Sequence, residues 1–272
     1  MRRLFCVIMV LLLWAGLAYA QEAAKDKLVA GVEWNNSRKN IENLNVIHLG
    51  LGSFFDASLA METDDVKVSE YLTLIGYEVS ENLVPYVLLG YVHIGMDQSL
   101  TGNIAAPFSG SIDLTQNEIR EGSFAYGLGA RGELTKIKEV SIGYDVRYLM
   151  SSLGEDDQRI SVLGYELNNS QDLDYTSLDL SLIASKEIQV DDNKYVKAVT
   201  PYVGYKLSKV DLNKKNNVTL GSISVGTEAN LTGITHSAIV GVSARINDSW
   251  STSFEALINK DIGLAVRATY KF

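Results

Sequence analysis

Three histidines, the side chains best suited to acid–base chemistry near neutral pH, are the first candidates for a catalytic role. They are His48, His93 and His236. A histidine–serine pair on a β-strand needs a spacing of two residues, because successive strand residues point to opposite faces. None of the three has a serine at that spacing, and His236 has Ser237 directly beside it. An aspartate two residues before the histidine, as in one class of outer-membrane proteases, is also missing, since the residue two positions before His236 is Ile234. The sequence predicts no catalytic histidine and no enzyme.

Short acidic runs are the next candidates, as metal ligands. They are Asp64-Asp65, Glu155-Asp156-Asp157 and Asp191-Asp192. A metal site needs several carboxylates to converge, and the calcium-loop spacing with its central glycine is absent. The only cysteine, Cys6, excludes a disulfide framework and a cysteine-based zinc site. We interpret the acidic runs as solvated loop charge and predict no metal and no cofactor.

The elements that would position any functional side chain are β-strands. The segment 262–272 alternates without a fault, with Val266 and Tyr270 on the apolar face and Arg267 and Thr269 on the polar face. An alternation over about ten residues is what a tilted membrane-spanning strand requires, whereas strands of soluble sandwiches usually have five or six residues. The same pattern recurs in segments 45–61, 120–134, 140–151, 173–186 and 250–259. The sequence predicts an all-β, antiparallel, up-and-down transmembrane β-barrel.

The number of strands follows from counting back from residue 272. The predicted strands are 262–272, 250–259, 233–246, 197–210, 173–186, 140–151, 120–134, 83–96, 67–79 and 45–61. Long polar links at about 97–120, 152–172 and 211–232 alternate with short turns, as in outer-membrane barrels. Residues 28–34 look like one further strand, and an even count is needed. In the first alternative, residues 21–44 form a periplasmic segment or an extra strand, and the barrel at 45–272 has about ten strands. In the second, the segment 45–61 breaks near Gly52-Ser53 and the barrel has twelve strands. Eight strands also stay open.

Charged residues of both signs stand on the polar faces of these strands. The predicted lumen charge network comprises Arg131, Glu133, Asp145, Arg147, Asp179, Arg245, Glu255 and Arg267. In a barrel near ten strands the interior is narrow, and opposite charges there would pair because an isolated buried ion is costly. The alternative is a narrow selective pore lined by the same side chains.

The first twenty residues have the features of a secretory signal peptide. Arg2 and Arg3 precede an apolar run at 4–13, and Ala18-Tyr19-Ala20 supplies small residues at the cleavage positions. A membrane-anchoring helix is the alternative, but the apolar run is short for one. The net charge of −9 disfavours nucleic-acid binding. We expect residues 1–20 to be removed on export.

These features together resemble the small outer-membrane β-barrels of the OmpA/OmpX-like group. The similarity lies in the amphipathic strands, the Gly-Tyr pairs, the runs 123–129 and 247–251, and the terminal Tyr270-Lys271-Phe272. The resemblance implies a location in the cell outer membrane among lipid and lipopolysaccharide. It also implies that the barrel-assembly machinery recognises Tyr270 and Phe272 as an assembly signal. The group is functionally mixed, so the resemblance implies no active site.

Two functions therefore stay open for the predicted barrel. The first is a structural or envelope-interaction barrel whose lumen is mostly filled by side chains. The second is a narrow porin-like channel for ions or small solutes. An outer-membrane enzyme and a soluble periplasmic sandwich are more distant alternatives.

Overall fold

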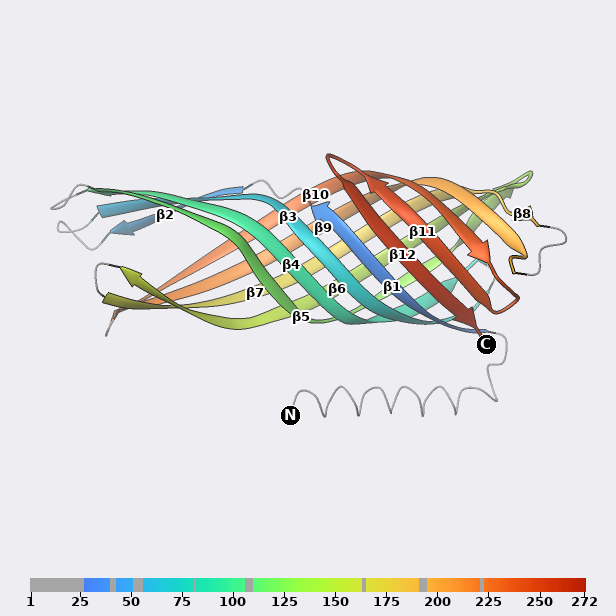
Figure 1. Ribbon diagram of the computed structural model, residues 1–272, viewed down its shortest axis with the longest axis horizontal. Coiled ribbons are helices and arrows are strands. Elements are labelled where there is room, and N and C mark those ends of the chain that lie inside the picture. The colour runs from blue at the N-terminus through green and yellow to red at the C-terminus, as the bar shows by residue number, and fades with distance from the viewer. Residues whose placement is uncertain are drawn as a thin grey trace.

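The computed structural model describes residues 27–39, 43–50, 56–80, 82–105, 110–162, 165–190, 195–220 and 223–272. These residues form strands joined by short turns (Figure 1). The strands are β1 (Leu28–Lys39), β2 (Asn43–Gly50), β3 (Asp56–Tyr77), β4 (Val84–Ala105), β5 (Gly110–Ile137), β6 (Val140–Val162), β7 (Tyr165–Ser185), β8 (Ile188–Gln189), β9 (Ala198–Leu220), β10 (Ile223–Arg245), β11 (Trp250–Ile258) and β12 (Ile262–Lys271). The predicted signal peptide at 1–20 lies outside the described residues.

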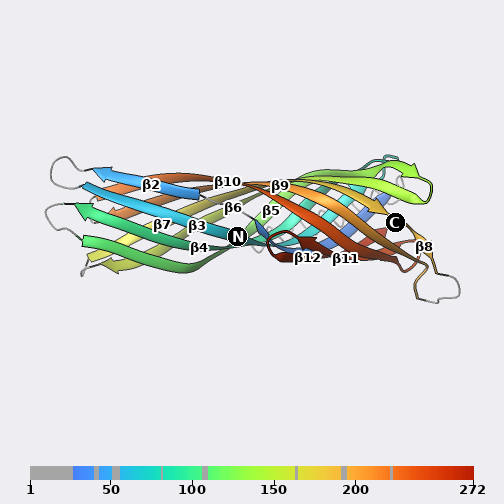
Figure 2. The ribbon, with the colours of Figure 1, turned by 90° about the horizontal axis from the view of Figure 1, so that it is seen from above.

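The strands close into an antiparallel barrel. Each strand of the ring pairs with its neighbours, and β1 closes it by pairing with β12 on one side and with β3 on the other. Val29 lies opposite Lys271 across the first pairing, and Leu28 lies opposite Tyr77 across the second. Since β2 and β8 stay outside the ring, ten strands form the closed wall. The predicted antiparallel barrel of ten strands is confirmed (Figures 1 and 2).

The identity of the first strands differs from the prediction. The barrel wall begins with β1, within the segment 21–44 that the sequence had placed before the barrel. The predicted strand 45–61 is wrong, because β2 ends at Gly50 and β3 begins at Asp56, and the two pair as a hairpin. The alternation is equally regular on both arms of a hairpin, so periodicity alone did not locate the reversal. The strand β3 then continues to Tyr77 and includes the predicted strand 67–79 up to that residue.

The predicted long polar links are also largely strand. The hairpins β4–β5, β6–β7 and β9–β10 continue as ladders until their tips at 106–109, 163–164 and 221–222, which lie outside the described residues. Backbone hydrogen bonding needs no apolar face, so a ladder can continue where the sequence is polar on both faces. The apolar periodicity that revealed the barrel strands is lost there.

The barrel wall divides into two sheets at the end where these hairpins protrude. Beyond Lys39, β3 pairs with β2 in place of β1, and the β5–β6 pairing ends at Ala125 and Ser151. The hairpins therefore continue as a β2–β3–β4–β5 group and a β6–β7–β9–β10 group, toward the left of Figure 1. Register shifts at Thr63/Val66, Met96/Gln98 and Leu153/Asp156 mark the division, consistent with bulges that bend a strand.

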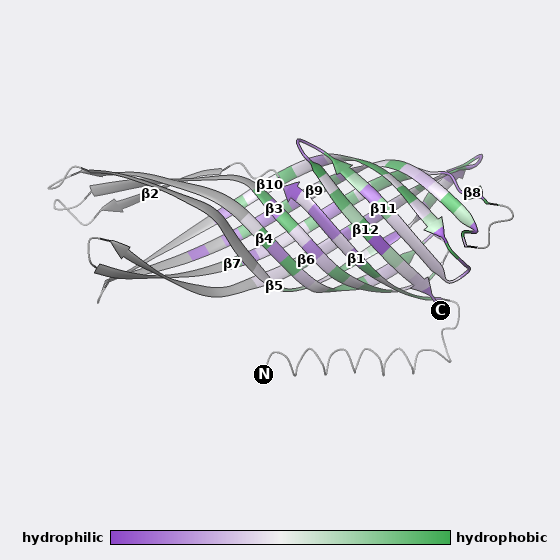
Figure 3. Ribbon diagram, in the orientation of Figure 1, coloured by the Kyte–Doolittle hydropathy of each residue, from purple (hydrophilic) through white to green (hydrophobic). Residues whose placement is uncertain are grey.

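The exterior of the barrel is apolar. Large hydrophobic side chains of the barrel strands are exposed and alternate with inward-facing residues, and the coloured part of the ribbon in Figure 3 alternates between hydrophobic and hydrophilic residues. Leu128, on the predicted apolar face of β5, is 62% exposed, whereas Arg147, on the predicted polar face of β6, is 6% exposed. An apolar outside with charged side chains buried inside is the inverse of a soluble protein and is typical of membrane-spanning barrels. Separately, the described residues include no helix long and apolar enough to cross a membrane.

The inside–outside assignment of β12 can be tested by substitution. Val266 lies on the exterior between Trp34 and Phe254, whereas Thr269 faces the lumen. We expect Val266→Arg to lower the free energy of unfolding by about 2–4 kcal/mol, because the charge enters the apolar exterior. Thr269→Arg should have a much smaller effect. The measurement is urea unfolding from lipid vesicles, and equal effects of the two substitutions would contradict the assignment.

Candidate functional site in the barrel lumen

Arg147 on β6 is the centre of the polar interior. Its guanidinium contacts three carboxylates from three other strands: Glu33 at 2.9 Å, Glu70 at 3.0 Å and Asp179 at 2.6 Å. All four side chains are at most 7% exposed. Two neutral side chains complete the shell of Glu70, which accepts hydrogen bonds from Asn35 Nδ2 and from the hydroxyl of Tyr175.

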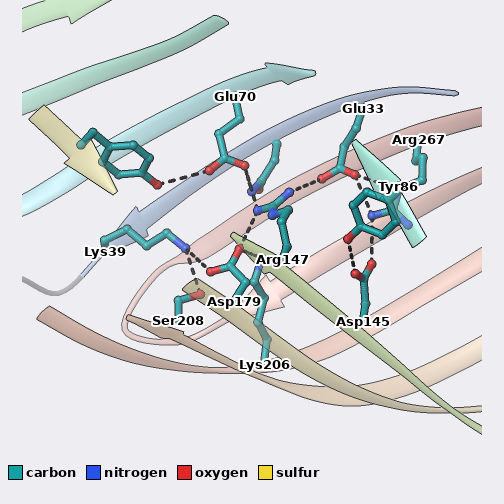
Figure 4. Close-up of polar contacts among 12 residues, drawn as sticks. Glu33, Lys39, Glu70, Tyr86, Asp145, Arg147, Asp179, Lys206, Ser208 and Arg267 are labelled. Atoms are coloured by element: carbon teal, nitrogen blue, oxygen red, sulfur yellow. Dashed lines mark hydrogen bonds and ion pairs between the residues drawn. The ribbon is translucent and has the colours of Figure 1, made fainter. Parts of the chain in front are cut away.

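Lysines extend the network on the side of Asp179. Lys206 Nζ lies 2.9 Å from Asp179 Oδ2, and Lys39 Nζ lies 3.7 Å from Oδ1. Lys39 also donates a hydrogen bond to Ser208 Oγ at 3.0 Å (Figure 4). Asp179 therefore faces three cations, which offsets the cost of burying its charge.

A third branch runs from Glu33 toward the short turns. Arg267 on β12 lies 2.7 Å from Glu33 Oε2 and 3.6 Å from Asp145 Oδ2. Asp145 in turn accepts a hydrogen bond from the hydroxyl of Tyr86. The complete network contains four carboxylates and four cations, so its formal charge is zero. Its members are Glu33, Glu70, Asp145, Asp179, Lys39, Arg147, Lys206 and Arg267.

An apolar layer closes the lumen on the long-hairpin side of this network. Further toward the hairpins, nine inward side chains from β3, β4, β7, β9 and β10 are hydrophobic and at most 1% exposed. This outer apolar layer consists of Val66, Val68, Val92, Ile94, Leu173, Tyr175, Val210, Leu212 and Leu231. Its side chains pack at the low exposure of a protein core, so the lumen is filled at this level.

A cavity occupies the lumen on the opposite side of the network, toward the short turns. Its volume is about 360 Å³, and Arg147, Glu33 and Asp179 line one end of it. The lining reaches Ser185 at the end of β7 and Thr269 near the end of β12, where the strands meet the short turns. We call this space the turn-end cavity. The charged network and the outer apolar layer separate it from the long hairpins.

Two lumen tyrosines have the same local surroundings, in Pro85-Tyr86 on β4 and Pro201-Tyr202 on β9. Tyr86 and Tyr202 each follow a proline, point inward, and lie opposite a glycine on the next strand, Gly129 and Gly241. A Cβ atom at either glycine would overlap the tyrosine ring. Because glycine has no side chain, each tyrosine ring can lie against the barrel wall. The hydroxyl of Tyr86 then donates a hydrogen bond to Asp145, and that of Tyr202 donates one to Glu255 at 3.3 Å.

The structure brings together part of the set that the sequence predicted for the lumen. Asp145, Arg147, Asp179 and Arg267 belong to the network, and Arg131 and Glu255 line the turn-end cavity. Two predicted members lie apart from both groups. Arg245, 40% exposed at its side chain, pairs with Glu187 near the turn end, and Glu133 forms no ion pair with the described residues.

Three central members of the network were missed from the sequence: Glu33, Lys39 and Glu70. The signal for β1 was present, because Glu33, Asn35, Ser37 and Lys39 all lie on its polar face. Because residues 21–44 were predicted to lie before the barrel, this polar face was not expected to face the lumen. Glu70 lies between apolar inward residues of β3. A single acidic residue on an otherwise apolar face does not indicate a charged lumen. The predicted set also lacked Lys206, whose ammonium pairs with Asp179.

The other candidate residues lie away from the lumen network. His236 is on the exterior of β10, where its ring contacts Tyr205, and His93 lies on β4. The side chains of His48 and of the acidic runs at 64–65 and 155–157 lie outside the described part of the structure, as do residues 191–192 entirely.

Ion pairs join the turns at the short-turn end. Lys186 Nζ lies 2.6 Å from Glu139, and Lys197 Nζ lies 2.8 Å from Asp248. In both pairs, the hydrogen bond from the lysine and its positive charge lower the pKa of the carboxyl below its usual value. Both carboxylates are fully in water, so these pairs contribute little to stability.

The terminal residues join the end of the chain to its first barrel strand. The backbone N–H of Phe272 donates a hydrogen bond to the carbonyl oxygen of Leu28 at 3.0 Å. The ring of Tyr270 packs edge-on against Trp250 and against Phe272, with ring centres 5.0 and 4.7 Å apart. The predicted assembly signal therefore lies at the seam where β12 meets β1.

Comparison with known proteins finds only distant similarity to solved structures. No family model matches the sequence, and no curated protein matches it either. Among solved structures, the β domain of the Bordetella autotransporter BrkA is 13% identical with a TM-score of 0.45, over 91% of this chain and 100% of that one. The Escherichia coli outer-membrane protease OmpT is 9% identical with a TM-score of 0.40, over 91% and 97%. The COG4313 outer-membrane channel of Pseudomonas putida F1 is 11% identical with a TM-score of 0.35, over 91% and 96%.

The role of Arg147 can be tested through stability. Arg147→Met leaves Glu33, Glu70 and Asp179 facing one another without their central cation. We expect a loss of about 3–5 kcal/mol in the free energy of unfolding, because uncompensated buried charge is costly. Arg245→Met is the matched control, since its exposed ion pair contributes about 0–1 kcal/mol. The measurement is urea unfolding of both variants, and a loss no larger than that of the control would contradict the central role of Arg147.

Proposed function

We propose that this protein is an integral outer-membrane barrel that does not conduct and serves as a structural or envelope-interaction anchor. The observation behind the proposal is the double closure of the lumen. The neutral charge network and the outer apolar layer lie one after the other along the same interior, and a solute would have to disrupt both. The apolar exterior and the predicted signal peptide support the location.

The protruding hairpins support a role in contacts outside the membrane. They continue the barrel strands as two sheets that bear no closed lumen, and they project from the end opposite the short turns. In outer-membrane barrels the long connections face the exterior and the short turns face the periplasm. In this orientation the hairpins project on the outer side of the membrane, and the turn-end cavity lies at the periplasmic end.

A narrow channel for ions or small solutes is the second candidate. The turn-end cavity favours it, since charged and hydroxyl side chains line a polar space inside the barrel. For conduction, the network around Arg147 and the apolar layer beyond it would both have to open.

Conductance in planar bilayers distinguishes the two functions. We expect protein purified from membranes to give no discrete conductance steps. Arg147→Ala should stay silent too, because the outer apolar layer remains in place. Wild-type steps whose size changes with Arg147→Ala or Arg267→Ala would support the channel instead. Val240→Ala, on the exterior, is the control that should change nothing in either case.

Assembly of the barrel provides a separate test of the membrane assignment. A closed barrel must pair its last strand with its first, since open edges in lipid leave backbone groups unsatisfied. We propose that the barrel-assembly machinery recognises Tyr270 and Phe272 on that last strand. Deleting Phe272 should leave export intact, lower the amount of folded barrel in the membrane fraction, and leave unfolded chain in the periplasm.

Heat-modifiable gel migration measures the folded barrel in this experiment. Thr269→Ser, on the same strand but facing the lumen, is the matched control and should assemble like the wild type. Equal amounts of heat-modifiable barrel from the wild-type and truncated chains would contradict a signal at Phe272.

A further inference from the structure

Arg131 is a cation that the lumen network does not include. It lines the turn-end cavity from β5, and it makes no hydrogen bond and no ion pair with the described residues. Asp145 lies opposite it in the β5–β6 register. That carboxylate already accepts a hydrogen bond from Tyr86 and faces Arg267. The guanidinium of Arg131 therefore has five donors beside a polar cavity, and none of them donates a hydrogen bond to a described residue.

Glu255 is the corresponding acid. It lines the same cavity from β11, and no cation of the described residues lies within ion-pair distance of its carboxylate. Its protein partner is the hydroxyl of Tyr202, which donates a hydrogen bond at 3.3 Å. The eight network members balance one another, so Arg131 and Glu255 are one extra charge of each sign.

The two residues line the cavity from opposite sides of the ring. In the closed ring the order of strands runs β5, β6, β7, β9, β10, β11, so β11 lies half-way around the ten-strand wall from β5. The charges therefore approach the cavity from opposite walls and do not pair with each other. Leaving single charges unpaired in a narrow interior is costly, and a ligand with complementary charges would offset that cost.

We propose that the turn-end cavity binds a small dipolar molecule, whose carboxylate pairs with Arg131 and whose ammonium pairs with Glu255. The cavity volume of about 360 Å³ is in the range of pockets that bind small molecules. Serine and threonine residues of the same lining provide further hydrogen-bonding groups; they include Ser181, Ser185, Thr200 and Ser253. The site goes beyond the anchor role, and it depends on the cavity alone and not on whether the lumen conducts.

Titration calorimetry with defined probes tests this site. The probes are ω-amino acids from 4-aminobutanoate to 8-aminooctanoate, added to protein purified in detergent, so that the spacing of the two charges is varied. We expect at least one of them to bind, and to bind at least about tenfold more tightly than the simple carboxylate and the simple amine of the same chain length. Failure of the whole series to bind, or equal binding of the singly charged compounds, would overturn the proposal.

Two substitutions assign the charges. Arg131→Gln should weaken binding of the best probe about tenfold and remove the affinity that the probe gains from its carboxylate. Glu255→Gln should likewise weaken binding about tenfold and remove the affinity that the probe gains from its ammonium group. Arg245→Gln is the matched control, because Arg245 pairs with Glu187 and does not line the cavity. Unchanged binding in both cavity variants would overturn the site. The comparison of probes on the wild-type protein needs no variant, so the test stands even if one variant fails to fold.

Discussion

The burial of Arg147 among three carboxylates is the interaction on which the interior of this barrel depends. Its guanidinium joins side chains from β1, β3 and β7. Of these three strands, only β7 pairs with β6 in the sheet. Ladder hydrogen bonds hold each strand only to its neighbours. The charge network therefore crosses the lumen and links walls that the sheet alone does not connect. Because an isolated buried ion is costly, the members must stay together, and this keeps the interior filled at that level.

The placement of polar and apolar layers follows from the same constraint. A ten-strand barrel is slightly too wide to be filled by one side chain from each wall and too narrow for a free aqueous pore. Here the interior is filled in two ways along its axis: by paired charges near the middle, and by packed hydrophobic side chains toward the long hairpins. What remains open is the turn-end cavity, where Tyr86 and Tyr202 lie on glycines and leave space between the walls.

This arrangement bears on function because it separates the two ends of the lumen. The hairpin end is closed by a dry apolar layer and continues into two sheets, whereas the turn end is polar and accessible. A barrel of this construction can present surfaces on both sides of a membrane without joining them by a pore. The proposed anchor role and the proposed ligand site at the turn end are therefore compatible, and they depend on different parts of the interior.

The amino-acid sequence by itself determined the all-β antiparallel barrel and which face of most strands is apolar, and it favoured ten strands without identifying all of them correctly. These are local properties, because a period of two residues appears in the sequence of each strand wherever one face meets an apolar surrounding. Arg147, Asp179 and Arg267 were recognisable as inward charges for the same reason. Only the tertiary structure decided that β1 closes the ring, that the chain reverses between Gly50 and Asp56, and that Glu33, Lys39 and Glu70 complete the network. Residues that form ion pairs across the lumen come from strands far apart in the chain. The alternation within each strand predicts which residues point inward but not which of them contact one another.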